Sequence, residues 1–181
     1  MKRLLLKILN KFRGEVSTEK LISHGMIIGK NFTRLQGCSL DISHCWLIEI
    51  GDNVTMAPEV RLIAHDASTK NDLNYTLIGK IKIGNDVFLG ARSIVLPNVT
   101  IGNNVVIGAG TIVTKDIPNN CVAAGSPARI IGTYSNYIEK RKLLMETCPV
   151  FSEKYTVRGG ISNIDKQKMR EALDNTIGFV I

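Results

Sequence analysis

The sequence of 181 residues lacks the features that mark several common functional classes. It has no apolar run of the roughly 18–20 residues that a membrane-spanning helix needs. It has no known nucleic-acid motif and no basic run with interleaved aromatic residues. The formal net charge of +7 therefore points to a different anionic partner, such as a phosphate-rich cofactor or a glycan, and not to nucleic acid. The length predicts one domain with a small appendage.

Cysteine pairs of the kind that bind zinc are also absent. The four cysteines form no CxxC pair, so we expect reduced and mostly buried thiols. The N-terminal stretch MKRLLLKILNKFRG is basic and leucine-rich, but Lys7 interrupts its apolar part and no small-residue cleavage site follows. We therefore expect no signal peptide and a cytoplasmic protein, in which disulfides are rare.

The sequence does contain a repeat with a period of six residues. Six hexapeptides follow one another in register: IGNDVF, LGARSI, VLPNVT, IGNNVV, IGAGTI and VTKDIP. Each opens with an aliphatic residue (Ile83, Leu89, Val95, Ile101, Ile107 and Val113) and has a small or β-branched residue in fifth place (Val87, Ser93, Val99, Val105, Thr111 and Ile117). Self-similarity at a fixed period is typical of stacked β-helical coils.

Three hexads make one triangular turn, so the sequence predicts four coils and a partial one. The coils are expected over residues 28–45, 50–67, 83–100 and 101–118, and the partial coil over residues 119–130. The residues WLIE after Cys45 shift the phase of the repeat. The hexapeptide repeat is interrupted between Ala67 and Ile83, where a polar and irregular loop is expected to protrude. Loops of this length are usually functional, although a tolerated surface insertion is the alternative.

Helices are expected at both ends of the chain. Residues 1–13 form an amphipathic pattern that either caps the open end of the coils or contacts a membrane surface. Residues 134–147 predict a helix that ends before Pro149, and residues 163–175 predict a second helix capped by Ser162 or Asn163. The predicted domains are a helical cap (1–27), a coiled domain (28–132) with its loop at 66–82, and a helical tail (133–181).

Three histidines are present, and His65 has the most informative position. It lies in LIAHD, where the regular coil opens into the long loop. A half-exposed imidazole on a rigid scaffold is well placed to act as a general base. His44 precedes it by 21 residues, which places it about one coil below as either an acceptor-site residue or a packed structural histidine.

The hexads, the loop with its histidine, VTKDIP and AAGSPARII together resemble the left-handed β-helix acyltransferases, in their O-acetyltransferase branch. Within it, the N-terminal sequence, DISHCWLIEIGDNVTMAPEV and AHDAS are similar to acetyltransferases of capsular and other surface polysaccharides. The resemblance implies a left-handed parallel β-helix and a homotrimer with active sites between subunits. It also implies acetyl-CoA as co-substrate and direct transfer of acetyl to a sugar hydroxyl, without a metal ion.

The resemblance also assigns roles to residues. His65 matches the catalytic general base, and the Ala91 N–H is a candidate donor to the oxyanion. The residues that match the acetyl-CoA site are Gly90, Ala91, Ala109, Thr114, Lys115 and Arg129. The candidates for binding the acceptor are His44, Asp66 and Tyr75. Leu35 and Gly132 depart from the family, because some sugar acetyltransferases have an acceptor-positioning asparagine and a second basic residue at these places.

Several alternatives stay open at this point. The partner that orients His65 is Asp66, Glu49, Asp41 or a backbone carbonyl, with Asp66 disfavoured because neighbours on a strand point apart. The acceptor could instead be the amine of a nucleotide-linked amino sugar or the hydroxyl of an antibiotic. A more remote reading is a non-catalytic or metal-dependent hexapeptide protein. The three histidines are each 20 or more residues apart in sequence, which argues against a zinc site.

Overall fold

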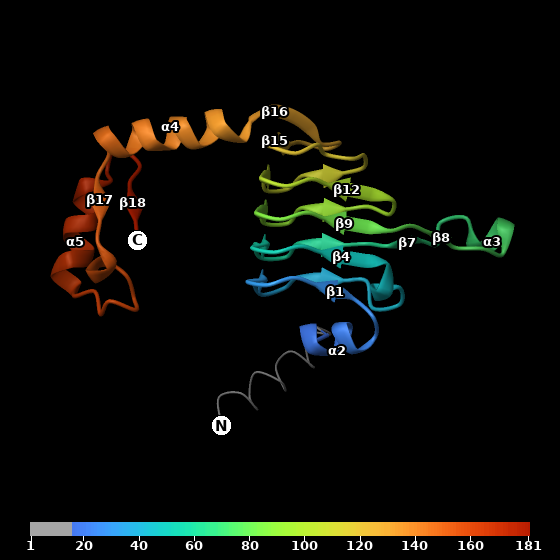
Figure 1. Cartoon of the computed structure of the whole chain (residues 1–181). Helices are drawn as coiled ribbons and strands as arrows, with labels where there is room; N and C mark the ends of the chain where they lie inside the picture. Colours follow the sequence, from blue (N-terminus) through green and yellow to red (C-terminus); the bar gives the residue numbers. More distant parts are fainter. Residues whose placement is uncertain (1–15) are drawn as a thin grey trace, which may run out of the picture. The chain divides into compact units, whose positions relative to one another are not determined.

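The computed structural model describes residues 16–181. The predicted helix at 1–13, with its alternatives of capping and membrane contact, lies outside these residues. The chain forms a stack of coils in which successive strands enter three sheets in rotation (Figure 1). The strands of the first sheet are, in order, β1 (Ile27–Ile28), β4 (Ile48–Ile50), β9 (Ile81–Ile83) and β12 (Val99–Ile101).

The other two sheets complete each coil. The second sheet contains β2 (Thr33–Arg34), β5 (Thr55–Met56), β10 (Val87–Leu89), β13 (Val105–Ile107), β15 (Cys121–Ala124) and β16 (Arg129–Thr133). The third sheet contains β3 (Ser39–Leu40), β6 (Arg61–Leu62), β11 (Ile94–Val95) and β14 (Ile112–Val113). All strand pairs within these sheets are parallel except β15–β16, which is antiparallel. The partial coil expected over residues 119–130 therefore contributes one strand and then folds back on it.

Burial confirms the predicted register of the hexads. The opening residues of all six hexads are inside the coils, and Ile101 is 1% exposed. The fifth-place residues are buried as well, including the polar Ser93 and Thr111. Burying a Val or Ile side chain contributes roughly 1.5–3 kcal/mol, so the stacked aliphatic rows are the main source of stability. A coil exposes these rows until the next coil covers them.

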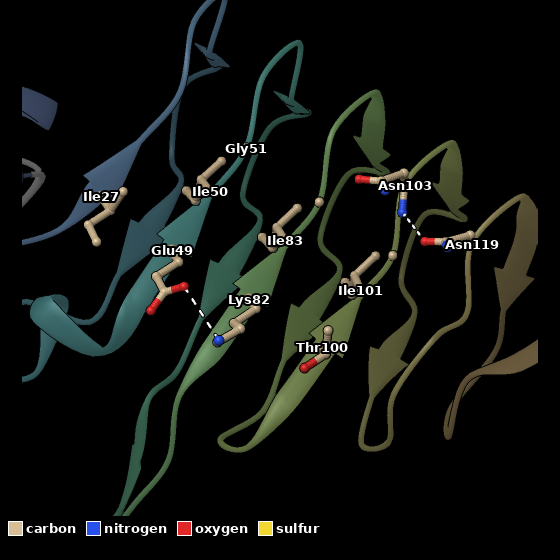
Figure 2. A pocket seen from close by; sticks show the side chains of 12 residues that line it. Ile27, Glu49, Ile50, Gly51, Lys82, Ile83, Thr100, Ile101, Asn103 and Asn119 are labelled. Carbon is tan, nitrogen blue, oxygen red and sulfur yellow. Dashed lines mark hydrogen bonds and ion pairs between the residues drawn. The ribbon is translucent and has the colours of Figure 1, made fainter.

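A ladder of side chains links the coils at the corner between the first and second sheets. Each rung is an Asx side chain whose Oδ1 accepts a hydrogen bond from the backbone N–H at the equivalent place in the preceding coil. The acceptors are Asp52, Asn85, Asn103 and Asn119, with N···O distances of 2.6–2.8 Å. Figure 2 shows the rung between Asn103 and Asn119. The ladder satisfies corner N–H groups that have no strand partner.

Two interruptions differ from a plain repeat. The phase shift at WLIE is a short 3-10 helix, η1 (Cys45–Leu47), between β3 and β4. The segment after Ala64 is more regular than expected, because β7 (His65–Asp66) and β8 (Leu77–Ile78) pair antiparallel and hold a short helix, α3 (Lys70–Leu73), at their end. The prediction of an irregular loop was therefore wrong in this respect. Before the coils begins a short helix, α2 (Thr18–Ser23), capped by the Ser17 side chain.

The chain divides into two compact units, the second of which is Ser135–Ile181. The helix α4 (Tyr134–Thr147) ends before Pro149, as predicted. The parallel strands β17 (Val150–Phe151) and β18 (Phe179–Val180), the 3-10 helix η2 (Glu153–Tyr155) and the helix α5 (Asn163–Ala172) make up the rest of this unit. Ser162 caps α5, since its hydroxyl oxygen accepts a hydrogen bond from the Asp165 N–H at 3.1 Å. No helix among the described residues has both the length and the apolar character needed to cross a membrane.

Candidate active site

The site is built around His65, at the corner where the third sheet gives way to the first. β6 ends at Leu62, and Ile63 and Ala64 carry the chain to this corner before β7 leaves the stack. The His65 side chain is 37% exposed, as expected for an imidazole at the point where the coil opens. Pairing of β7 with β8 fixes its backbone, because His65 lies opposite Ile78.

Asp41 is the residue that orients His65. It follows β3 one coil earlier, its side chain is 2% exposed, and its Oδ2 contacts His65 Nδ1. The same oxygen accepts a hydrogen bond from the Ala64 N–H at 3.0 Å. Oδ1 accepts two more, from the N–H groups of Ser43 (3.0 Å) and His44 (3.2 Å). Four donors thus hold the carboxylate in one place.

This contact decides which nitrogen of His65 is basic. A carboxylate only accepts hydrogen bonds, so the neutral ring carries its proton on Nδ1. Nε2 is then the nitrogen with a free lone pair. A partly exposed imidazole with a basic Nε2 and a buried carboxylate behind it can remove a proton from a hydroxyl.

Of the other proposed partners, neither Asp66 nor Glu49 takes this position. Asp66 accepts a hydrogen bond from the Ser68 N–H at 2.8 Å, and its pKa is lowered mainly by this bond. Glu49 lies on the outer face of the first sheet, where its carboxylate is 3.7 Å from the Lys82 ammonium group (Figure 2). It is also 3.8 Å from the ammonium group of Lys80. Tyr75 is 79% exposed near the end of the ribbon formed by β7 and β8.

His44 lies beside the pair formed by Asp41 and His65. Its ring centroid is 5.3 Å from that of His65, and its Nδ1 is 3.9 Å from Asp41 Oδ1. This nitrogen is buried and has no hydrogen-bond partner in the structure of the described residues. On the other side of His44, the ring of Trp46 lies 5.5 Å away, centroid to centroid. Trp46 was not among the residues predicted from the sequence, although it is the only tryptophan and lies in the segment that breaks the repeat.

Asp41, His44 and His65 could also hold a metal ion. The ligand atoms of Asp41, His44 and His65 lie within 4.8 Å of one another. Spacing in the sequence argued against a zinc site, although it placed His44 about one coil below His65. Stacking of the coils also brings Asp41, 24 positions before His65, to the same point. In the structure, however, Asp41 uses both oxygens to accept hydrogen bonds from backbone N–H groups.

The residues predicted to bind acetyl-CoA divide between two corners. Thr114 and Lys115 are exposed just after β14, at the same corner as His65 but two coils further along. Gly90 and Ala91 follow β10, at the corner between the second and third sheets, and Ala109 follows β13 at that corner in the next coil. Arg129 lies opposite Ala124, at the end of β15. The width of the third sheet therefore separates His65 from Gly90 and Ala91 within one chain.

Gly90 is a site of close approach between coils. A Cβ at this position would lie 2.5 Å from the Ala109 N and 2.7 Å from the Ile107 O. Only glycine fits here, and Gly90 is buried between the coils. Beside it, the half-buried Ala91 and the exposed Ala109 form a strip of small residues along two coils.

A broad groove lies elsewhere, over the outer face of the first sheet. It has a volume of about 470 Å³ and extends from Ile27 past Lys82 to Asn119 (Figure 2). His65 does not line it. The groove therefore does not coincide with the cluster of Asp41, His44 and His65.

Comparison with known proteins agrees with this fold. The family model described as "Bacterial transferase hexapeptide (six repeats)" matches residues 80–115. Protein CapG of Staphylococcus aureus is 40% identical over 145 residues, which cover 77% of this chain and 83% of that protein. Galactoside O-acetyltransferase of Escherichia coli is 47% identical over 109 residues, or 58% of this chain and 52% of that enzyme.

Two solved structures are similar as well. A maltose O-acetyltransferase from Clostridium difficile shares 43% identity with a TM-score of 0.54, over 61% of this chain and 59% of that one. A hexapeptide-repeat acetyltransferase from Vibrio cholerae, solved with acetyl coenzyme A, shares 26% identity with a TM-score of 0.55, over 61% of each chain. The chain belongs to the family of hexapeptide-repeat acetyltransferases.

Proposed function

We propose that this acetyltransferase moves an acetyl group from acetyl-CoA to a hydroxyl of a sugar in a surface polysaccharide or its precursor. The contact between His65 Nδ1 and the buried Asp41 carboxylate is the observation that carries the proposal. It supplies a basic Nε2 at a partly exposed corner. The similarity to galactoside and maltose O-acetyltransferases favours a sugar hydroxyl as the acceptor.

In the proposed mechanism, His65 Nε2 takes the proton of the acceptor hydroxyl as its oxygen attacks the thioester carbonyl carbon. The Ala91 N–H donates to the oxyanion that develops. When the carbon–sulfur bond breaks, the sulfur leaves with the electron pair and receives the proton from His65. Asp41 holds Nδ1–H throughout and stabilises the imidazolium, and no residue becomes acetylated. The scheme requires no metal ion.

The active enzyme in this proposal is a homotrimer of left-handed β-helices, located in the cytoplasm. The separation of the two corners supports the oligomer, because His65 of one copy can meet the strip around Gly90 and Ala91 only on a neighbouring copy. Lys115 and Arg129 are exposed and cationic, which suits the phosphates of acetyl-CoA. Residues 28–132 would form the catalytic domain, with the tail at 133–181 outside the chemistry.

The test is a thiol-release assay with acetyl-CoA and a panel of acceptors. The panel includes methyl galactosides and maltose. It also includes an amino sugar nucleotide and a hydroxylated antibiotic, so that both alternative acceptors are measured in the same assay. His65→Ala should lower kcat by about 10²–10⁴-fold, the usual contribution of a general base. His24→Ala is the matched control, because His24 is exposed at the end of α2 and outside the cluster. Full turnover by a correctly assembled His65→Ala variant would contradict the mechanism.

A further inference from the structure

Trp46 is held outward by the turn that contains it. In η1 the flanking Cys45 is fully buried and Leu47 packs against the core, so the residue between them faces solvent. Trp46 is 53% exposed. Gly25 packs against the base of the Trp46 side chain, since a Cβ at Gly25 would lie 3.1 Å from Trp46 Cβ. The indole thus offers apolar surface to solvent beside the cluster of Asp41, His44 and His65.

Trp46 is the end of a row of three rings that leads to His65. The centroids are 5.5 Å apart from Trp46 to His44, and 5.3 Å apart from His44 to His65. Both imidazoles turn Nδ1 toward Asp41, His65 in contact and His44 at 3.9 Å. Nε2 of each ring therefore lies on the side away from the carboxylate. Trp46 therefore supplies an apolar ring surface, His44 supplies a polar Nε2, and His65 supplies the base.

We propose that Trp46 and His44 form the subsite for a pyranose ring of the acceptor. A pyranose has an apolar face of C–H groups and hydroxyls around its rim. The indole of Trp46 would stack on the apolar face, and His44 Nε2 would hydrogen-bond a hydroxyl next to the one that reaches His65. This inference rests on the proposed function, because it takes the reacting group to be a sugar hydroxyl.

Direct binding gives the first test, since Trp46 is the only tryptophan and its fluorescence reports on this position alone. The protein without acetyl-CoA is titrated with methyl pyranosides of galactose, glucose, mannose and N-acetylglucosamine, and with sorbitol. A saturable change with at least one pyranoside and none with sorbitol, which has hydroxyls but no ring face, is expected. No saturable change with any of the four pyranosides would overturn the subsite.

Steady-state kinetics give the second test. Trp46→Ala should raise the KM for the best acceptor about tenfold and leave the KM for acetyl-CoA unchanged. Trp46→Phe should recover most of the loss, because a smaller aromatic face remains. The matched control is Ile27→Ala, which removes an equally exposed apolar side chain from the outer face of the first sheet (Figure 2). An unchanged acceptor KM in Trp46→Ala would overturn the proposal.

The two tests separate this inference from the proposed function. Saturable pyranoside binding without acetyl transfer to any acceptor would support the subsite and contradict the proposed transferase reaction. Acetyl transfer that depends on His65 but does not change when Trp46 is substituted would support the proposed function and contradict the subsite. Thermal melting of Trp46→Phe, which disturbs the turn least, shows whether a kinetic loss comes from the subsite or from unfolding.

Discussion

The carboxylate of Asp41 contacts Nδ1 of His65 from a position 24 residues earlier in the chain. Stacking of coils creates this pair, because β3 and β6 are neighbours in the third sheet and their ends meet at one corner. Asp41 acts on the reaction only through His65, so we regard it as a positioning residue.

Asp41→Asn tests this relationship. An amide can present its NH₂ group to Nδ1 and favour the wrong tautomer, so we expect kcat to fall by about 10²–10⁴-fold with little change in the KM for acetyl-CoA. The pH dependence of kcat should shift as well, which a purely structural defect would not produce. The measurements are steady-state kinetics across pH.

The control for Asp41→Asn is Asp52→Asn. Like Asp41, Asp52 accepts a hydrogen bond from a backbone N–H of a neighbouring coil, in this case that of Lys30 at 2.6 Å. The other rungs of its ladder are asparagines. Its substitution should leave kcat unchanged. Equal losses in both variants would show that Asp41 only holds coils together.

Ile101→Asp tests the register of the repeat. Ile101 is 1% exposed between two coils, and an unpaired carboxylate there should destabilise the fold by about 3–5 kcal/mol or more. Thr100→Asp is the control, because Thr100 is exposed on the outer face of the same strand (Figure 2). Urea denaturation measures both, and equal midpoints for the two variants would refute the register.

Gly90→Ala tests the close approach of coils at the strip beside the third sheet. The added Cβ would meet backbone atoms of Ile107 and Ala109 at 2.7 and 2.5 Å, so the coils must shift apart. We expect a loss of stability of about 1–3 kcal/mol. Gly132→Ala should be neutral, since nothing lies within 4 Å of a Cβ there. A melting temperature for Gly90→Ala that matches the parent protein would contradict the packing.

Asp165 makes the second unit sensitive to acid. The Ser162 hydroxyl, which donates to Asp165 Oδ2 at 2.7 Å, is the main cause that lowers the pKa of this carboxyl below its usual 3.8. A lowered pKa stabilises the folded unit above the unfolded pKa, and this contribution is lost as the pH falls through the folded pKa. Ser162→Ala should raise the pKa of Asp165, and Ser162→Thr should keep it low. Carboxyl NMR titrations measure both, and identical pKa values in the parent protein and Ser162→Ala would refute this account.

Much of the fold was accessible from local sequence. The hexads set which side chains face inward, because a strand and a corner together take six residues. A different local signal, a helical segment followed by Pro149, predicted α4 and its end. Neither signal predicted the ribbon of β7 and β8, because the polar sequence of this segment carries no repeat and its strands pair residues 11 and 13 positions apart.

The sequence by itself determined the six-residue period, the burial of its aliphatic rows and the choice of His65 as the histidine to test. Only the tertiary structure selected Asp41 over Glu49 and Asp66, and only it placed His44 and Trp46 beside the base. The physical reason is that a repeat specifies the inside of each coil through local geometry. Contacts at the corners depend on how successive coils are aligned, and a single phase shift at Cys45–Leu47 changes that alignment.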